Sequence, residues 1–291
     1  MITGLIRLTR WRDHLPFTLP ATLLGVNMAL TATEQTPDAR IILVLLANTG
    51  AVTFAFMVND IEDAPDDARD PARAAQNAIT SGLITPRLGW FASVSVGLLA
   101  LLFFAGVNAI TLLTGTLTVS LGGLYSWRKV RLKALPVIDV IAHVLMLSSL
   151  LFLAGYFAYS STPGAAWWVA LGVGFISAYG QLYNQLRDYD MDQAAGLRNT
   201  AYLLGRTRTQ WAMYASLGLA AFCLGISVLL GLWPLWLGFV GLGLLPILLI
   251  FKTANDMRGT TAIDATGQLQ LGAMLLASAI MIIWLVVIIM V

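Results

Sequence analysis

Residues 41–67 read IILVLLANTGAVTFAFMVNDIEDAPDD, so an apolar run over 41–58 leads directly into a cluster of acids. The run is long enough to cross a hydrocarbon core of roughly 30 Å as a helix. Ionised carboxylates near lipid are costly, which indicates that a chain holding several of them at the end of a span uses them. A second cluster, NQLRDYDMD, occupies residues 184–192 at the end of another apolar run.

The whole chain has the composition of a membrane protein. Of its 291 residues 58% are hydrophobic and 11% charged, and the mean hydropathy is +0.79. Runs of spanning length recur without the short alternating segments of a β-barrel. We predict an all-α, polytopic fold of nine transmembrane helices around a central cavity. The predicted spans are 15–33, 41–58, 87–106, 108–126, 136–160, 166–186, 210–230, 233–251 and 267–291.

The basic residues divide unevenly between the loops that these spans define. Every Lys and Arg except Arg40 falls on one side, and basic loops face the cytosol. We therefore expect a cytosolic N-terminus, a multi-pass location in a bacterial or archaeal plasma membrane, and a site that faces the cytosol. This topology explains the net charge of +2, so no nucleic acid partner is expected beside the lipid bilayer.

We expect one domain over residues 1–291 and see no sign of an obligatory protein partner. Its two long inner loops, about 59–86 and 184–209, exceed what a helix connection needs and are expected to hold the function. Both loops carry Asn, spaced Asp, Arg and Gly between two apolar runs. This likeness indicates an internal duplication with a site between the halves.

Polar side chains in each cluster recur every fourth residue, the spacing that aligns them on one helix face. Pro65 is expected to end or kink the first of these helices near Ala64. Oxygen ligands without His or Cys favour a hard cation, and carboxylates that leave room for phosphate oxygens and water suit Mg²⁺. Two facing sets predict two metal sites with a polyanion between them. The sets are Asn59, Asp63 and Asp67, and Asn184, Asp188 and Asp192.

Cationic residues lie close to both clusters. A diphosphate bridged by magnesium keeps charge that Arg and Lys can pair with. We therefore predict a diphosphate site at the mouth of a lipophilic bundle, with an apolar tail among the helices. The flanking residues are Arg69, Arg73, Arg187 and Arg198, and the loop after the fourth span adds Arg128, Lys129, Arg131 and Lys133.

These residues resemble the motifs of the UbiA superfamily of intramembrane prenyltransferases. The first family motif, N-D-x-x-D-x-x-x-D, matches Asn59, Asp60, Asp63 and Asp67. The second, D-x-x-x-D, matches Asp188 and Asp192, and a Y-x-x-x-K element matches Tyr125 and Lys129. The resemblance covers essentially the whole chain. It departs at residues 75–82, AQNAITSG, where many relatives carry a basic residue and a proline; we expect Arg73 to supply the missing charge.

The resemblance implies Mg²⁺-dependent transfer of a prenyl group from an allylic prenyl diphosphate to a lipophilic acceptor, with release of pyrophosphate. The metal would stabilise the leaving diphosphate, and aromatic faces in a water-poor cavity would stabilise the allylic cation. The implied metal ligands are Asn59, Asp60, Asp63, Asp67, Asp188 and Asp192, with Asn184 assisting. Lys129, Tyr125 and Arg198 are expected to contact the diphosphate.

Other polar residues have two interpretations each. Asp190 is expected to deprotonate an acceptor or to tune the metals. Asn27, inside the first span, is expected to face the substrate, with interhelical packing as the alternative. Asp139 either caps the fifth span or serves the site. His143 is expected to be a satisfied interior histidine.

The residues do not select the acceptor. A quinone-precursor aromatic is the first expectation; the alternatives are a carotenoid, a glycerophosphate lipid, or cyclisation of the prenyl chain as in a UbiA-type terpene cyclase. A non-catalytic transporter with acids for ion coupling is the alternative from another class, although such acids are expected near the bilayer midplane. A CDP-alcohol phosphatidyltransferase would require a D-G-x-x-A-R core, which the sequence lacks.

Overall fold

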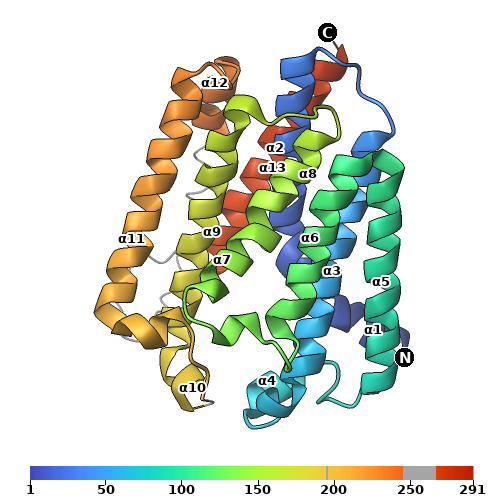
Figure 1. Cartoon of the computed structure of the whole chain (residues 1–291), viewed down its shortest axis with the longest axis vertical. Helices are drawn as coiled ribbons and strands as arrows, with labels where there is room; N and C mark the ends of the chain where they lie inside the picture. The colour runs from blue at the N-terminus through green and yellow to red at the C-terminus, as the bar shows by residue number, and fades with distance from the viewer. Residues whose placement is uncertain (195, 245–266, 291) are drawn as a thin grey trace.

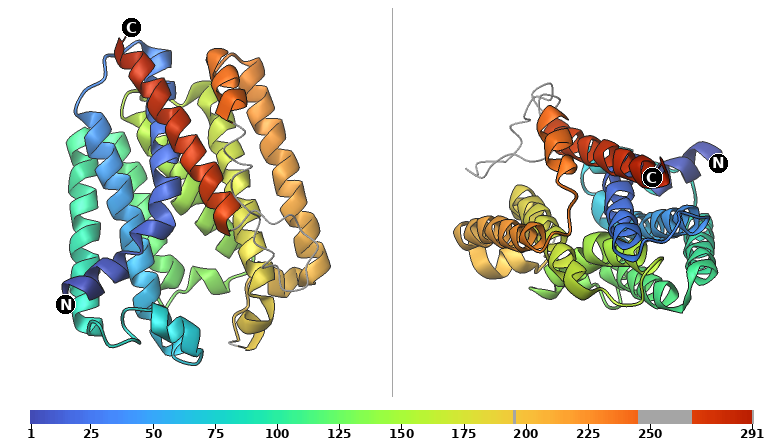
Figure 2. Two further views of the ribbon diagram at one scale, coloured as in Figure 1. Left: turned by 180° about the vertical axis from the view of Figure 1, so that it is seen from behind. Right: turned by 90° about the horizontal axis from the view of Figure 1, so that it is seen from above.

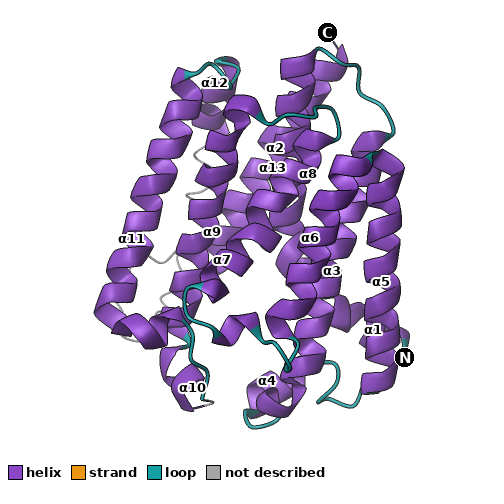
Figure 3. Cartoon of the chain, in the orientation of Figure 1, coloured by secondary structure: helices purple, strands orange, loops and turns teal. Residues whose placement is uncertain are grey.

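The computed structural model describes residues 1–194, 196–244 and 267–290, and within these ranges every regular element is a helix (Figure 3). The all-α prediction is therefore confirmed. In the described part of the chain, eight helices are long and apolar enough to cross a membrane. They are α2 (Trp11–Thr33), α3 (Arg40–Asp67), α5 (Pro86–Val107), α6 (Ala109–Ser126), the segment Ile138–Phe157, α9 (Trp167–Arg187), α11 (Thr200–Leu229) and α13 (Gly267–Met290).

The predicted span 233–251 is described only in its first part, as α12 (Trp236–Leu244). The rest of that span lies outside the described residues, so the count of nine stays a prediction. The segment Ile138–Phe157 consists of α7 (Ile138–Val144), the π-helix η2 (Leu145–Ser149) and α8 (Leu150–Phe157).

Helix starts follow local capping chemistry. Thr85 accepts a hydrogen bond from the backbone N–H of Leu88, and Pro86 takes the first position of α5. Asn108 alone separates α5 from α6; it accepts from the N–H of Thr111 and donates to the carbonyl of Phe157 at 2.7 Å. This single residue therefore turns the chain and ties the turn to α8.

The spanning helices stand side by side along the long axis of the molecule (Figure 1). Helix α3 packs against α5 and α6, α2 against α8, and α9 against α11. Helix α13 crosses α2 obliquely on the face of the bundle that the left panel of Figure 2 shows.

Two glycines bring the backbones of α2 and α8 into contact. A Cβ atom on Gly25 would lie 2.0 Å from the carbonyl oxygen of Phe152, and one on Gly155 would lie 2.3 Å from that of Thr22. Asn48 of α3 donates to the carbonyl of Leu151 at 2.9 Å beside this contact. Small residues and buried amides are the usual means by which helices associate in lipid.

Both acidic clusters lie at one end of the bundle, which we call the motif end. The short helices α4 (Pro71–Gln76) and α10 (Tyr189–Ala194) are also there (Figure 1), and α1 (Ile2–Thr9) packs against α3 and α5. The links between α2 and α3 and between α8 and α9 lie at the other end, which we call the opposite end.

The helical path through each cluster differs slightly from the prediction. Of the two predicted effects of Pro65, a helix end near Ala64 is wrong, because α3 continues through the proline to Asp67, and a kink there stays a prediction. The proline removes one backbone hydrogen bond where the helix is about to end. After α9 ends at Arg187, Asp188 connects it to α10, yet the backbone bonds from Asp188 to Asn184 and from Asp192 to Asp188 both remain at 2.9 Å.

Candidate functional site

The first cluster uses the predicted face of α3. The amide of Asn59 donates to Asp63 Oδ2 and to Ser126 Oγ of α6, both at 2.9 Å. Asn77, just after α4, donates to Asp67 Oδ2 at 2.8 Å and to the carbonyl of Asp60 at 2.7 Å. These bonds orient the carboxylates of the first motif.

Asp60, which the motif match placed among the metal ligands, borders the same cavity, but its carboxylate binds Arg10. Position 60 is about 100° around the helix from position 59. Its carboxylate accepts from Arg10 NH1 at 3.2 Å and is buried. Arg10 lies between α1 and α2 with φ 46° and also binds Asp13 at 2.8 Å. Asp60 therefore holds the α1–α2 junction against α3, and its role as a metal ligand stays a prediction.

The second cluster comes from the end of α9 and from α10. Asp188 Oδ2 lies 3.3 Å from Arg187 NH2 and 3.6 Å from Arg73 NH2 of the first loop. Asp192 Oδ2 accepts from the amide of Asn199 at 2.9 Å. Burial, together with the neighbouring Asp188 carboxylate, raises the pKa of Asp192 to about 6. The two aspartates therefore share one region of negative potential.

A cavity of about 750 Å³ joins the two clusters at the motif end. The ion pair between Arg73 and Asp188 links the halves across it. It is lined by Asn59, Asp60, Asp63, Asp67 and Asp188 of the motifs, by Arg73, Gln76, Asn77 and Arg187 beside them, and by Thr3, Ile6, Arg7, Arg10, Trp11, Arg12 and Asp13 of the N-terminal segment.

The N-terminal lining was missed by the sequence analysis. Arg7, Arg10 and Arg12 satisfy the rule that basic residues gather on the inner side, so their number carried no further signal. In the structure Arg7 donates to the carbonyl of Ala75 at 3.0 Å and fixes α1 beside the first loop.

The lysine at this site is Lys133, whereas the Y-x-x-x-K match indicated Lys129. Lys133 is buried, and its ammonium group binds both carboxylate oxygens of Asp63. Lys129 is exposed, with its Nζ 5.6 Å from the ring centroid of Trp127. The reason is a reversal of the chain at Arg131 (φ 51°) into the 3₁₀ helix η1 (Leu132–Ala134).

The basic loop after α6 is anchored by the remaining acids of the first cluster. Arg128 and Arg131 both bind Asp66 Oδ2, at 3.0 and 2.9 Å, and Arg128 Nε donates to the carbonyl of Glu62 at 2.8 Å. These acids thus position the loop that carries Lys133.

A buried aspartate organises the second loop. Asp139, near the start of α7, is fully buried and accepts from Gln185 Nε2 at 2.7 Å, from the N–H of Thr200 at 2.8 Å, and from the Thr200 hydroxyl. Val137 is held at φ 71°, with its N–H bonded to Thr200 Oγ1 at 2.7 Å. A β-branched residue at positive φ is strained. Asp139 therefore joins α7, α9 and α11 in addition to lying in the first turn of α7.

The other predicted site residues are dispersed. Tyr125 accepts from Gln181 Nε2 at 2.9 Å inside the bundle. Asn184 is half-buried on α9, and Arg198 is exposed on the second loop.

The cavity lining does not include seven of the predicted site residues, which are Asn27, Tyr125, Lys129, Asn184, Asp190, Asp192 and Arg198. Asp190 is 78% exposed and pairs with Arg206 at 2.6 Å, so its carboxylate points to solvent. Asn27 donates to the carbonyl of Met281 at 2.8 Å and joins α2 to α13, the packing alternative.

The donor chemistry of the cluster fits Mg²⁺, because carboxylate and amide oxygens are the protein atoms available and cationic side chains already lie against them. Among the described residues no three His, Cys, Asp or Glu side chains group closely enough to hold a metal ion by themselves. Each ion would therefore take two carboxylates from one motif and complete its shell with phosphate oxygens and water, as Mg²⁺ commonly does.

The chain matches the UbiA prenyltransferase family over residues 18–266. One curated relative is a lycopene elongase/hydratase from Haloarcula japonica, 27% identical over 263 residues, which is 82% of each chain. A second protein of that name, from Corynebacterium glutamicum, is 29% identical over 155 residues, 51% of this chain and 52% of the relative.

Solved structures share the fold. A UbiA homolog from Archaeoglobus fulgidus bound to GPP and Mg²⁺ has a TM-score of 0.77 and 23% identity, covering 99% of this chain and all of that one. A homolog from Aeropyrum pernix K1 has a TM-score of 0.73 and 20% identity, covering 93% of this chain and 98% of that one. The eight apolar helices make the protein an integral, multi-pass membrane protein. Since the family match extends over most of the sequence, the chain belongs to the UbiA prenyltransferase family.

Proposed function

We propose that this protein transfers a prenyl group from an allylic prenyl diphosphate to a lipophilic acceptor in a Mg²⁺-dependent reaction that releases pyrophosphate. One observation carries the proposal: carboxylates of both motifs, Asp63, Asp67 and Asp188, border a single cavity with arginines around it. A diphosphate with bound cations has the matching charge distribution. The related A. fulgidus structure holds GPP and Mg²⁺, which supports this ligand class.

Some residues of the site would bind the metal ions, and others would orient the residues that do. Asp63 and Asp67 would hold one Mg²⁺ and Asp188 and Asp192 the other; when bound, the metal neutralises the diphosphate and makes it a better leaving group. Asn59 and Asn77 fix the first pair of carboxylates through the hydrogen bonds described above. The apolar helices exclude water from the hydrocarbon part of the donor.

Two cationic side chains beside the carboxylates are suited to pair with the negative charge of the leaving diphosphate. Arg73, which already spans to Asp188 at 3.6 Å, would pair with diphosphate oxygens between the halves. Lys133 binds Asp63 and would set the position of that carboxylate or share the diphosphate charge. Arg73 offers a planar guanidinium that can bind two oxygens at once, whereas Lys133 offers a compact ammonium charge.

For the acceptor we propose a linear polyene of the carotenoid class. Two relatives named lycopene elongase/hydratase support it, one of them along 82% of both chains. This proposal replaces the quinone-precursor aromatic as the first candidate. Acids gathered at one end of the bundle favour an enzyme over an ion-coupled transporter, whose acids are expected near the midplane. We further propose that the motif end faces the cytosol, where basic loops are retained.

The test is pyrophosphate release by purified protein in detergent, with dimethylallyl or geranyl diphosphate and lycopene, with Mg²⁺ present or chelated. We expect Asp63→Ala and Asp188→Ala to lower release by at least about 100-fold, the scale of lost transition-state charge stabilisation. Asp190→Ala is the matched control, because Asp190 is an exposed acid on α10 beside the second motif.

Mass analysis of the organic extract identifies the acceptor. An elongated polyene supports the carotenoid class, whereas product only with an aromatic or a glycerophosphate lipid would replace it. A hydrocarbon formed from the donor alone would indicate cyclisation. Release that ignores chelation, or that survives both substitutions, would overturn the proposed chemistry.

A further inference from the structure

Two buried asparagines, one after each acidic motif, make the same bond to the last aspartate of that motif. Asn77 Nδ2 donates to Asp67 Oδ2 at 2.8 Å. Asn199 Nδ2 donates to Asp192 Oδ2 at 2.9 Å. Both asparagines are 3% exposed, so these amides do not exchange the carboxylate for solvent. The two halves of the site therefore share one arrangement, in which a neutral amide holds a single oxygen of the last aspartate.

The oxygen of each amide also forms a hydrogen bond, and this fixes the direction in which the amide points. Asn77 Oδ1 accepts from the backbone N–H of Ile79 at 2.8 Å. Asn199 Oδ1 accepts from that of Tyr202 at 3.0 Å and begins α11. A reversed amide would set its oxygen against the carboxylate and its nitrogen against a backbone N–H, which loses both bonds. Each loop therefore presents an N–H, and not an oxygen, to the aspartate.

Further bonds hold the two asparagines in place. The second N–H of the Asn77 amide donates to the carbonyl of Asp60 on α3 at 2.7 Å. Thr200, which follows Asn199, donates its backbone N–H to the fully buried Asp139 of α7 at 2.8 Å. The first amide is thus fixed to α3 and the second to α7, so neither depends on the loop alone.

The aspartate one turn earlier in each motif is bound in another way. Lys133 binds both carboxylate oxygens of Asp63. Arg187 donates to both oxygens of Asp188, at 3.3 Å each. These two carboxylates already face cationic side chains on both oxygens. Among the described residues, by contrast, no hydrogen bond reaches Oδ1 of either last aspartate.

We propose that Asn77 and Asn199 are positioning residues that leave one oxygen of the last aspartate for the metal, and that they thereby select Mg²⁺ over Ca²⁺. This proposal rests on the proposed function. Mg²⁺ needs a near-ideal octahedral shell, whereas Ca²⁺ takes about six to eight oxygens and often both oxygens of one carboxylate. A carboxylate whose Oδ2 is held by a fixed N–H offers Oδ1 in one direction, which suits the smaller ion.

The test measures cation binding in place of turnover. Purified protein in detergent is titrated with Mn²⁺ in the presence of geranyl thiolodiphosphate, a donor analogue that resists ionisation, and bound Mn²⁺ is followed by EPR spectroscopy. Mn²⁺ prefers the same carboxylate and water oxygens as Mg²⁺. Mg²⁺ and Ca²⁺ then serve as competitors, and the ratio of their affinities reports the selectivity.

Serine is the informative substitution at both positions. Its hydroxyl can still accept from the backbone N–H of the following turn, but it lacks the amide N–H that reaches the carboxylate. We expect Asn77→Ser and Asn199→Ser each to lower Mg²⁺ affinity by about 10-fold or more and to change Ca²⁺ affinity by less than about 3-fold, since partners of metal ligands act on this scale.

Asn108→Ser is the matched control. Asn108 makes the same two kinds of bond at the opposite end of the bundle, because its Oδ1 accepts from the N–H of Thr111 and its Nδ2 donates to the carbonyl of Phe157. This variant should leave both cation affinities unchanged.

The outcomes separate the two proposals. An unchanged ratio of Mg²⁺ to Ca²⁺ affinity in the serine variants, including equal losses for both ions, would overturn the selectivity and leave the metal-dependent transfer intact. Wild-type protein that binds no Mn²⁺ with the analogue would overturn that chemistry and this inference together. Thermal unfolding without metal reports folding, and if one variant fails to fold the other decides, because the two bonds lie in separate loops.

Discussion

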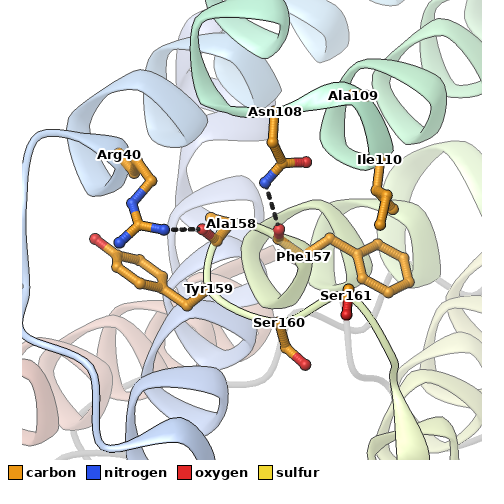
Figure 4. Close-up of a pocket in the computed structure, with 9 residues that line it drawn as sticks. All are labelled: Arg40, Asn108, Ala109, Ile110, Phe157, Ala158, Tyr159, Ser160 and Ser161. Carbon is orange, nitrogen blue, oxygen red and sulfur yellow. Dashed lines mark hydrogen bonds between the residues drawn. The ribbon is translucent and has the colours of Figure 1, made fainter.

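At the opposite end of the bundle one arginine, Arg40, is surrounded by hydrogen-bond acceptors, whereas at the motif end several acids line one cavity. Arg40 donates to Asp38, to the carbonyl of Ala158 at 3.0 Å and to Gln35 at 3.1 Å, and its guanidinium lies 4.1 Å above the ring of Tyr159. Arg40, Ala158 and Tyr159 border a pocket of about 370 Å³ (Figure 4), half the volume of the motif-end cavity.

The same side-chain type has opposite pKa shifts at the two ends. Hydrogen bonds from Arg40 lower the pKa of Asp38 to about 2. Burial and the neighbouring Asp188 raise the pKa of Asp192 to about 6. Asp38 already has its cation, whereas burial and the Asp188 carboxylate outweigh the nearby positive charges of Arg73 and Lys133 at Asp192. The comparison indicates that the opposite end is structurally complete and that the motif end is built to receive cations.

The largest effect is expected at Asp139. Asp139→Ala removes an acceptor that serves Gln185 and two donors of Thr200, and leaves them buried without it. We expect a loss of about 3 kcal/mol in the free energy of unfolding. Thermal unfolding in detergent measures it, with Asp38→Ala as the control from the opposite end. Equal losses in both variants would remove the contrast between buried and exposed acids.

Lys133 should be next in importance. Lys133→Met removes the cation from Asp63, and we expect pyrophosphate release to fall by about 10- to 100-fold, as when a residue that supports metal ligands is lost. Lys129→Met is the matched control and should change release less than about 2-fold, because Lys129 is exposed. A larger loss of pyrophosphate release in Lys129→Met than in Lys133→Met would support the motif-based assignment of Lys129.

Substitution of Asp60 distinguishes between a positioning role and a metal-binding role for this residue. Asp60→Ala should free Arg10 and loosen the α1 wall of the cavity, which raises KM for the diphosphate by about 3- to 10-fold with little change in kcat, the signature of lost uniform binding. We expect Arg10→Ala to raise KM for the diphosphate as well. If Asp60 binds metal instead, kcat falls by about 100-fold.

The smallest effect concerns Asp38. Its pKa in the folded protein lies below the ordinary 3.8, so its stabilising contribution is present above that value and is lost as pH falls toward 2. Because the side chain is 48% exposed, we expect Asp38→Asn to cost less than about 1 kcal/mol at pH 7. Denaturant unfolding at pH 7 and near pH 2 checks this; a difference that grows on acidification would contradict it.

Sequence patterns predicted the fold well because spanning runs and four-residue spacing are local properties. The contact between Asn59 and Asp63 follows directly from α-helical periodicity. The same periodicity would have separated Asp60 from that face, had it been applied instead of the motif.

Lys133 and Arg10 were beyond sequence reasoning for a different reason. Their positions depend on left-handed backbone at Arg131 and at Arg10 itself, in residue types with no preference for it. The contact between His143 and Ser177 depends on how α7 packs against α9 beside a π segment, which no short pattern in the sequence specifies.

The close approach of α2 and α8 also limits where a lipid molecule can pass between the helices. With Gly25 and Gly155 pressed against carbonyl oxygens of the facing helix, this seam has no width for a hydrocarbon chain. An acceptor that enters from the bilayer, as proposed, would therefore have to pass between another pair of helices. A side chain added at either glycine would push α2 and α8 apart at this contact.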